Sequence, residues 1–191
     1  RDSQSVVALD MGIKFFTVTS DGEFVENPKH LFEKLAILRI QQRKLSRMKK
    51  GGKNWNKQLI VVQRLYLKVK RCRLDFLQKQ STLLSNNYET VIVEDLNIKG
   101  MSKNKRLSKH ILDCGWGTFF SLLEYKTNVI KVNPRYSSQE CSKCGHTCKE
   151  NRPTQSLFEC IKCGFIENAD KNATLNLFQR GQSLMEANVN Q

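Results

Sequence analysis

The sequence predicts a mixed α/β protein, in which a mixed β-sheet carries an inserted basic helical hairpin and a small zinc module. Short apolar runs at residues 6–9, 91–93 and 129–132 are typical of buried strands. Helical periodicity replaces these patterns between residues 30 and 87. Two Cys-x-x-Cys pairs follow the last of the strands. No glycine-rich phosphate loop follows a strand, so an alternating nucleotide-binding array is not expected.

The N-terminal part of the chain predicts three strands. Val6-Val7-Ala8-Leu9 suits a buried strand that ends at Asp10. Residues 15–20 and 23–26 predict two further strands, because Asp21-Gly22 between them is a typical hairpin turn.

Two helices are expected next. One covers residues 30–50, Gly51-Gly52 breaks it, and a longer one covers about residues 55–84. A short glycine turn between them favours antiparallel packing. Cys72 on the second helix, and Cys114 farther along, fall in apolar patterns and are expected to be buried thiols.

The second half of the chain predicts a helix on either side of the cysteine pairs. A basic loop over residues 99–110 leads into a helix at 111–126, whose start is weakened by Gly115. A final helix is predicted to begin at Asp170 and to end at Gly181, which suits a C-cap, with frayed residues beyond it.

Length and composition indicate one folded core with a basic surface. The chain has 191 residues, of which 39% are hydrophobic, so one domain or one domain with a small appendage is expected. Lys and Arg number 32 against 18 Asp and Glu, a net charge of +14. Such an excess favours a polyanionic partner, and nucleic acid before an acidic membrane.

Neither a membrane span nor a secretion signal is evident. The longest apolar runs are short, such as Leu59-Ile60-Val61-Val62, so no membrane partner is expected. The chain opens with Arg1-Asp2-Ser3, without an initiator Met or an apolar signal core. We therefore expect a fragment of a longer protein that is not secreted, and that is cytoplasmic and associated with the nucleoid.

The predicted hairpin carries charge of a single sign. Between Arg39 and Leu74 lie thirteen Lys or Arg and no acid. A solvated face would normally mix signs to gain favourable pairs along the helix, so contact with phosphates is the preferred interpretation. Trp55 near the turn either stacks on a base or belongs to the core. The cations expected to bind nucleic acid, including three in the basic loop, are Arg43, Lys44, Arg47, Lys49, Lys50, Lys53, Lys57, Arg64, Lys103, Lys105 and Arg106.

Four of the seven cysteines have the spacing of a zinc site. Cys141-x-x-Cys144 and Cys160-x-x-Cys163 are separated by fifteen residues, and a glycine follows each pair. Two such turns facing each other supply four thiolates to a tetrahedral, structural Zn²⁺. The alternatives are redox or surface thiols, and His146 and Cys148 are competing ligands. We call residues 137–167 the cysteine ribbon.

Three acids occupy positions where packing does not require them. Asp10 and Glu94 each follow an apolar strand, and Asp170 opens the predicted final helix. Converging carboxylates repel one another unless divalent cations neutralise them, and Mg²⁺ or Mn²⁺ prefers oxygen ligands. Two such ions cut phosphodiesters. Asp95 competes with Glu94, and a turn acid or a helix cap would explain Asp10 or Asp170 equally well.

Several stretches resemble the motifs of the transposon-encoded TnpB proteins. DMGIK at residues 10–14, with SDG at 20–22 and ENP at 26–28, resembles the first motif, and VIVEDLNIKGM at 91–101 resembles the second. SQECSKCG at 138–145 resembles their zinc ribbon, DKNATLN at 170–176 their third motif, and LSR at 45–47 with the basic run after it their linker helices. The likeness covers nearly the whole chain, in the same order.

The resemblance implies an RNase H-like (RuvC) fold, as in the related type V CRISPR effectors. Its catalytic acids map to Asp10, Glu94 and Asp170, and Asp95 is left out. It further implies RNA-guided DNA cleavage by the full-length protein, a transposable element, and a ribbon that helps to load DNA. The implied domains are a nuclease core at 1–136, including a basic hairpin at 30–87, the ribbon at 137–167, and a last motif with a C-terminal helix at 168–191.

Two further functions compete with nuclease activity. The family's amino-terminal part, which holds the guide RNA and reads the target-adjacent motif, is absent here, so guided cutting by this fragment alone is not expected. A protein that occupies DNA or RNA without cutting is therefore the main rival. A purely structural zinc scaffold would leave the basic hairpin unexplained.

Overall fold

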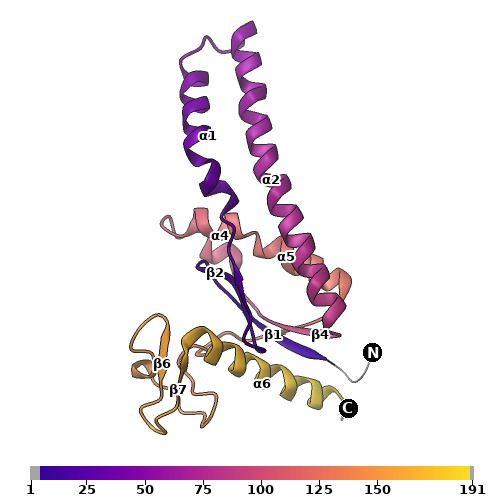
Figure 1. Ribbon diagram of the computed structural model, residues 1–191, viewed down its shortest axis with the longest axis vertical. Coiled ribbons are helices and arrows are strands. Elements are labelled where there is room, and N and C mark those ends of the chain that lie inside the picture. The colour runs from indigo at the N-terminus through magenta and orange to yellow at the C-terminus, as the bar shows by residue number, and fades with distance from the viewer. Residues whose placement is uncertain (1–4, 190–191) are drawn as a thin grey trace.

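A five-stranded mixed sheet forms the centre of the computed structural model, which describes residues 5–189 (Figure 1). The strand order is β3-β2-β1-β4-β5. The first three strands are antiparallel neighbours, whereas β1, β4 and β5 run parallel. The strands are β1 (Val6–Met11), β2 (Phe15–Thr19), β3 (Phe24–Glu26), β4 (Thr90–Glu94) and β5 (Asn128–Val132). The predicted mixed sheet is confirmed.

Helices cover both faces of this sheet. The long hairpin of α1 and α2 rises from one side, and α6 crosses the other side beside the cysteine ribbon (Figure 1). The ribbon holds a short two-stranded sheet and a single 3₁₀ turn, η1 (Lys149–Asn151). The helices are α1 (His30–Ser46), α2 (Lys53–Asn87), α3 (Ile98–Met101), α4 (Ser108–Cys114), α5 (Trp116–Lys126) and α6 (Ala169–Val189); the ribbon strands are β6 (Leu157–Glu159) and β7 (Ile166–Asn168).

Side-chain alternation along the central strands divides the core into two layers. Val91 and Val93 point toward α2 and α5, where they pack with Leu77 and Phe119. Ile92, between them, points to the opposite face and packs with Leu177 of α6, as Ala8 of β1 does. Residues of even number on these strands therefore face α6, which decides where the strand-end acids point.

Asp113 anchors the hairpin to the body. Its carboxylate accepts hydrogen bonds from the backbone N–H of Leu31, at the start of α1, and pairs with Arg73 of α2 at 2.6 Å. Asp113 is buried, so this ion pair lies largely out of water and its charge is compensated there. The hairpin tip thus projects far from the core on an anchored base.

Two helix predictions were wrong because of glycines. The predicted helix 111–126 is interrupted at Gly115, whose φ of 71° ends α4 and starts α5. Gly181 is not a C-cap, since α6 continues through it to Val189. The sequence cannot reveal that Gly181 lies directly over Ile92, where a Cβ atom would come within 2.2 Å of the isoleucine Cδ1.

The remaining predictions about the elements have mixed outcomes. Cys114 is buried as expected, but Cys72 lies exposed on α2. Among the described residues, no helix is both long and apolar enough to cross a bilayer. Residues 1–4, which include the opening Arg1-Asp2-Ser3, and residues 190–191, at the end of the predicted frayed segment, lie outside the described range.

Replacing Gly181 with Ala should destabilise the chain although alanine favours helix. The added methyl would overlap Ile92, and such overpacking costs about 1–3 kcal/mol of unfolding free energy. Gly117→Ala is the matched control, because its Cβ would meet Ile98 at an ordinary 3.8 Å. Urea denaturation measures both variants. A Gly181→Ala protein as stable as the parent would contradict close packing of α6 on β4.

Candidate metal centres and nucleic-acid surface

The four predicted cysteines converge on one point. The sulfurs of Cys141, Cys144, Cys160 and Cys163 all lie within 4.8 Å of one another. Two of the separations are 3.7 Å (Cys141 to Cys163) and 3.6 Å (Cys144 to Cys160). Ligands about 2.3 Å from a tetrahedral zinc are about 3.8 Å apart, so the donor set and its spacing fit Zn²⁺.

Two equivalent turns build this cluster. The N–H of Gly145 donates to the carbonyl of Cys141, and the N–H of Gly164 donates to the carbonyl of Cys160, both at 2.8 Å. Both glycines have positive φ, 71° and 69°, which side chains other than glycine adopt only with strain. The doubled Cys-x-x-Cys-Gly pattern in the sequence therefore predicted the geometry correctly.

The competing ligands take no part in the cluster. The thiol of Cys148 donates to the Glu150 carboxylate instead, at 2.6 Å. Within the cluster, burial raises the pKa of Cys141 to about 12. Burial also acts on Cys160, but the backbone N–H groups of Cys163 and Lys162 outweigh it and lower the pKa of Cys160 to about 7. Because a metal ligand must be a thiolate, affinity for zinc should rise with pH.

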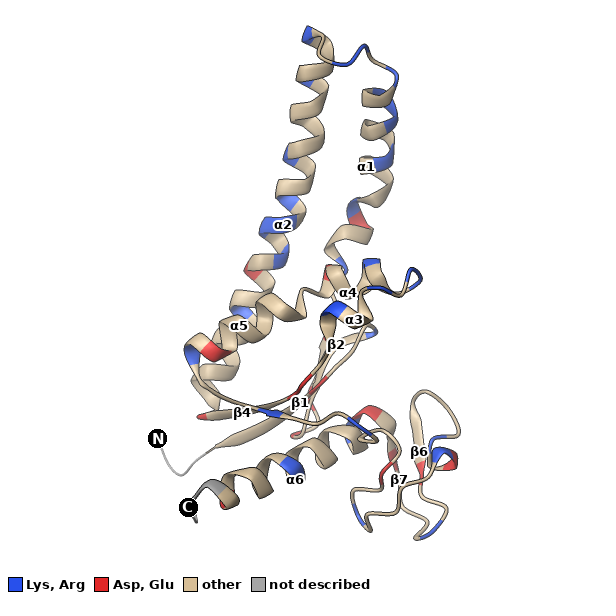
Figure 2. Cartoon of the chain, turned by 180° about the vertical axis from the view of Figure 1, so that it is seen from behind, with Lys and Arg blue, Asp and Glu red and all other residues tan. Residues whose placement is uncertain are grey.

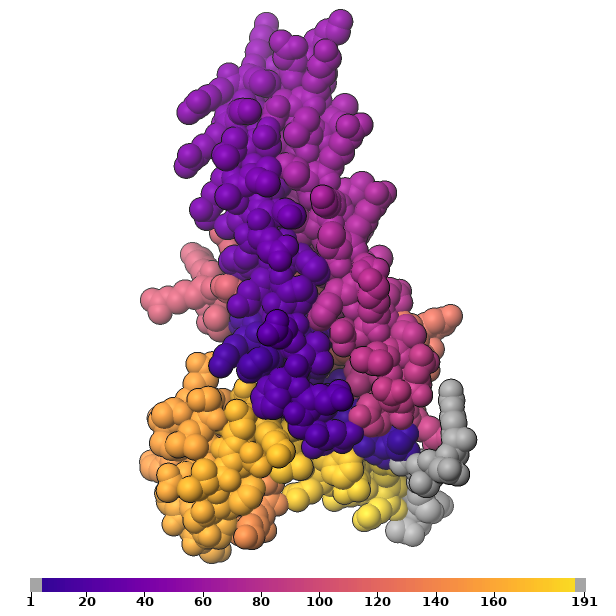
Figure 3. All heavy atoms as spheres, in the orientation of Figure 1, coloured from indigo at the N-terminus to yellow at the C-terminus, as the bar shows by residue number. Residues whose placement is uncertain are grey.

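Helix α6 holds the ribbon through amide side chains. Asn172 and Asn176 both donate to the carbonyl of Glu140, at 2.8 and 2.7 Å, and Asn176 also donates to the carbonyl of Ser137. The N–H of Ser142 donates back to Asn172 at 3.1 Å. Both asparagines are buried, so their bonds form where water does not compete. The space-filling view shows ribbon and helix as one lobe (Figure 3).

The three predicted acids face the same side of the sheet. Leu9 of β1 pairs with Val93 of β4, so the next residue on each of these parallel strands, Asp10 and Glu94, lies beside the other. Both have even numbers and therefore point toward α6. Asp170 lies in the first turn of α6. Glu94 is buried at 8% exposure, whereas Asp95 is exposed, so alternation separates the two neighbouring acids.

Asp170 is not the helix cap that its position suggested. The side chain of Asn168 accepts hydrogen bonds from the N–H groups of Asp170 and Lys171, at 2.9 and 3.2 Å. Asn168 therefore satisfies the free backbone donors at the start of α6. The carboxylate of Asp170 is left to face its neighbours across the sheet.

The electrostatics show that the acids influence one another. Burial, with the nearby charges of Glu94 and Asp170, raises the pKa of Asp10 well above its usual value. Burial raises the pKa of Glu94 to about 7, against the opposing effects of the Ser137 hydroxyl and Arg180. Without a compensating cation, ionised carboxylates are thus disfavoured here.

Arg152 of the ribbon is a component of this site that sequence reasoning missed. Its guanidinium donates to Asp170 at 3.2 Å and to the carbonyl of Gln155 at 2.6 Å. Together with Asp10 these residues line a cavity of about 220 Å³. Among residues 5–189 the four cysteines are the one tight cluster of three or more metal-ligating side chains, so the acids are spaced more widely. No spacing pattern marks Arg152 in the sequence.

The predicted nucleic-acid contacts lie on two exposed surfaces. Arg43, Lys44, Arg47, Lys49, Lys50, Lys53, Lys57 and Arg64 are exposed along the hairpin, and Lys103, Lys105 and Arg106 on the loop between α3 and α4. Lys and Arg recur along both helices (Figure 2). Within the described residues, Arg73 is the one of the thirteen hairpin cations that pairs with a carboxylate. The others remain available to phosphates.

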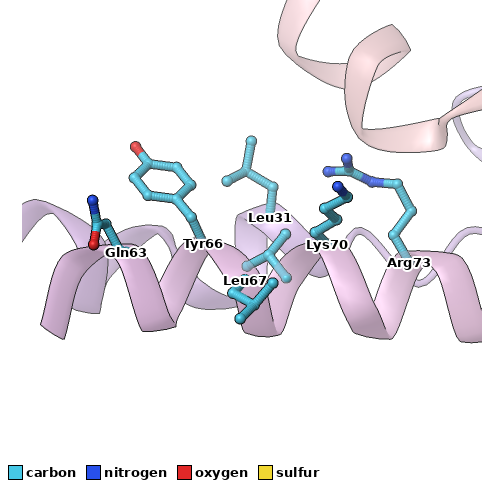
Figure 4. Close-up of a pocket in the computed structure, with 7 residues that line it drawn as sticks. Leu31, Gln63, Tyr66, Leu67, Lys70 and Arg73 are labelled. Carbon is cyan, nitrogen blue, oxygen red and sulfur yellow. The ribbon is translucent and has the colours of Figure 1, made fainter. Parts of the chain in front are cut away.

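A largely apolar groove of about 570 Å³ lies at the base of the hairpin. Gln63, Tyr66, Lys70 and Arg73 project to the same side of α2, with Leu31 of α1 beside them (Figure 4). The Tyr66 hydroxyl accepts a hydrogen bond from Gln42 of α1 at 2.8 Å. This contact joins the two helices above the Asp113 anchor.

Comparison with known proteins assigns the family. Residues 1–105 match the model of the OrfB_IS605 family, described as "Probable transposase". The chain belongs to this transposase family. Residues 116–177 also match the Cas12f1-like TNB domain, which covers the cysteine cluster.

Curated relatives of this chain include a named endonuclease and a TnpB-like protein. The "Putative RNA-guided DNA endonuclease InsQ" of Escherichia coli K12 is 37% identical over 96% of the chain and 50% of the relative. A TnpB-like protein of Methanocaldococcus jannaschii is 31% identical over 76% of the chain and 35% of the relative. The chain thus spans about half the length of the first of these relatives.

Solved structures share the fold of this chain. The Cas12f1 chain in a complex with guide RNA and target DNA aligns with a TM-score of 0.57 and 24% identity, covering 90% of this chain and 48% of the other. CasPhi-2 bound to crRNA aligns with a TM-score of 0.61 and 16% identity, covering 92% and 47%. At these identities the comparison establishes the architecture.

Cys160→Ser should release zinc and loosen the ribbon, because metal binding and local folding share their free energy. Cys148→Ser is the matched control and should retain the metal, since Cys148 bonds to Glu150 outside the cluster. Zinc per chain is measured by atomic absorption after gel filtration. Full zinc content in Cys160→Ser, or its loss in Cys148→Ser, would show that the ligands are different.

Raising the pH should destabilise the chain through Glu94 when Mg²⁺ is absent. The folded carboxyl, with a pKa of about 7 against 4.5 ordinarily, holds its proton more tightly than the unfolded one. The stabilisation that comes from this tighter proton binding is therefore complete below about pH 4.5 and is lost as the pH rises through 7. The total loss in the free energy of unfolding is up to about 3 kcal/mol. Glu94→Gln should lack this loss and be more stable than the parent at pH 8. Parallel stability curves for the two proteins between pH 5 and 8 would contradict it.

Proposed function

We propose that the chain is the nuclease portion of a transposon-encoded, RNA-guided DNA endonuclease of the TnpB type. The observation that carries this proposal is the common orientation of Asp10, Glu94 and Asp170, whose charges act on one another beneath α6. Glu94 is buried, and the charges of Glu94 and Asp170 disfavour ionisation of Asp10. Such a grouping of carboxylates is unfavourable for folding alone, so a function that requires it would explain its presence. Under this proposal the sheet is an RNase H-like (RuvC) core.

The three acids would hold catalytic Mg²⁺ or Mn²⁺. All three offer hard oxygen donors, and a divalent cation would relieve the repulsion that raises the pKa of Asp10. When bound, such ions activate water and stabilise the attacking and leaving oxygens of a phosphodiester. Arg152 lines the same cavity as Asp10 and Asp170, so a phosphate that entered it would meet positive charge.

The protein's own groups would set the charge and position of these acids. The hydroxyl of Ser137 lies 3.4 Å from the Glu94 carboxylate and favours its ionised form. Arg180 contributes in the same sense, while bonding to the carbonyls of Asn133 and Arg135. Both residues belong to the contact between the ribbon and α6. Packing of the ribbon against α6 would therefore also favour the ionised form of Glu94, which is the form that binds a cation.

The ribbon and the basic hairpin would supply structure and binding. A structural Zn²⁺ on the four cysteines would keep Arg152 at the acid site. The exposed cations of the hairpin and of the α3–α4 loop would follow nucleic-acid phosphates. In this division residues 1–136 form the core, 137–167 the ribbon, and 168–191 the last acid with its helix.

The partners follow from the same proposal. DNA would be the substrate and a guide RNA would bind the full-length protein, as the name of the InsQ relative and the Cas12f1 complex suggest. Guided cutting would require the half of the relatives that this chain does not cover. A nucleoid-associated, cytoplasmic protein would suit both partners.

A protein that binds nucleic acid without cutting it is the second candidate. The ion pair between Arg152 and Asp170 favours it, because a guanidinium already compensates one acid without any metal. The basic hairpin would serve either function equally well. Dependence on divalent ions distinguishes the two.

Glu94→Gln should abolish Mg²⁺- or Mn²⁺-dependent cleavage of labelled single-stranded DNA and leave DNA affinity largely unchanged. Glu94 faces α6, whereas the neighbouring Asp95 is exposed on the other side, so Asp95→Asn is the matched control and should cut normally. Cleavage in gels and binding by fluorescence anisotropy are measured on the same preparations. Cutting that survives Glu94→Gln, or equal loss of cutting and binding, would refute the catalytic assignment. If neither parent nor variant cuts, the binding role is supported instead.

A further inference from the structure

The turn that joins α1 and α2 lies at the far end of the molecule from the sheet (Figure 1) and borders a pocket. Its volume is about 440 Å³. The backbone there is ordered by its own bonds: Met48 donates to the carbonyl of Leu45 at 3.2 Å, and Gly52 donates to that of Lys49 at 3.1 Å. The lining residues are Met48, Lys49, Gly52, Lys53, Asn54 and Trp55.

Trp55 has no role in the core. The hydrophobic core clusters form around the sheet, against the other end of α2, and in the ribbon. The indole is instead partly exposed beside the side chain of Met48 in the tip pocket. The part of the indole that stays exposed offers an aromatic surface on which a partner can stack.

The charge around the indole selects the partner. Lys49 and Lys53 line the pocket, and Lys50 and Lys57 lie exposed beside it in the sequence, with no acid between residues 39 and 74. A flat aromatic surface among ammonium groups matches a base and its flanking phosphates. Lys and Arg continue along both helices (Figure 2). Such a row of cations matches the repeated phosphates of a nucleic-acid strand better than it matches a single acidic side chain of a protein partner.

We propose that the hairpin tip is a binding site for an unpaired nucleotide, whose base stacks on Trp55 while Lys49 and Lys53 contact its phosphates. The site would hold a single-stranded segment of DNA or RNA at a distance from the acids. Paired bases present only their edges and backbone to a protein surface, so an intact duplex would not use the indole. This inference rests on the nucleic-acid binding proposed above and adds to it a defined contact.

Tryptophan fluorescence tests the proposal on the 191-residue chain. Trp116, the second tryptophan, is 2% exposed and gives a constant background. Short oligo(dT) and oligo(rU) are titrated separately, so that the response of each indicates whether DNA, RNA or both enter the site. We expect saturable quenching by a single strand, and none by a covalently closed circular duplex, which has no open base-pair face.

Variants separate stacking from charge. Trp55→Ala should weaken single-strand binding, measured by anisotropy, about 5- to 150-fold and leave duplex binding unchanged. Trp55→Phe should keep most of the affinity and lose the quenching. Tyr125→Ala, which removes an exposed aromatic side chain from α5 and leaves the hairpin intact, should keep both the affinity and the quenching.

The outcomes distinguish this inference from the proposed function. Oligonucleotide binding without quenching, or equal quenching by the duplex, would overturn the tip site and leave the nuclease proposal intact. An unchanged affinity in Trp55→Ala would overturn it too. Absence of any binding at low salt would overturn both the tip site and the nucleic-acid surface from which it was argued.

Discussion

The hydrogen bonds that Asn172 and Asn176 donate to the carbonyl of Glu140 join the cysteine ribbon to the sheet through α6. Both side chains are buried, so a loss of either would leave polar groups unpaired away from water. The same helix carries Asp170 in its first turn and packs Leu177 on the sheet. One contact surface, between α6 and its neighbours, therefore determines where Asp170 lies, how the ribbon attaches and how the second core layer packs.

That surface also explains why the acids can be crowded together. Burial raises the pKa of both Asp10 and Glu94, and the charges of Glu94 and Asp170 raise that of Asp10 further, a cost that the surrounding core must offset. Arg152 of the ribbon compensates part of this negative charge by pairing with Asp170. The four-cysteine cluster, whose donor set fits a structural Zn²⁺, would thereby bear on the proposed acid site, because it lies in the same ribbon as Arg152.

Periodicity and spacing predicted most of the fold, because alternation and heptads report directly on which side chains are buried. The four clustered cysteines were predictable because each Cys-x-x-Cys turn is followed by a glycine at the position that needs positive φ. Contacts between distant segments leave no such pattern. In the sequence Gly181 resembles a helix cap, and only the structure shows that it packs against Ile92. Arg152 likewise resembles an ordinary surface cation in the sequence, whereas in the folded chain it pairs with Asp170. The family resemblance alone selected Glu94 over Asp95, and the strand register now places Glu94, with Asp10, on the side of the sheet that faces α6.

Anomalous diffraction from crystals of the chain grown with zinc and soaked in Mn²⁺ tests the central claim most directly. The account predicts a zinc peak among the four cysteines and manganese density in contact with Asp10, Glu94 and Asp170, with the guanidinium of Arg152 moved away from Asp170. Manganese that binds elsewhere, or an acid site that stays closed by the Arg152 pair at saturating Mn²⁺, would contradict it.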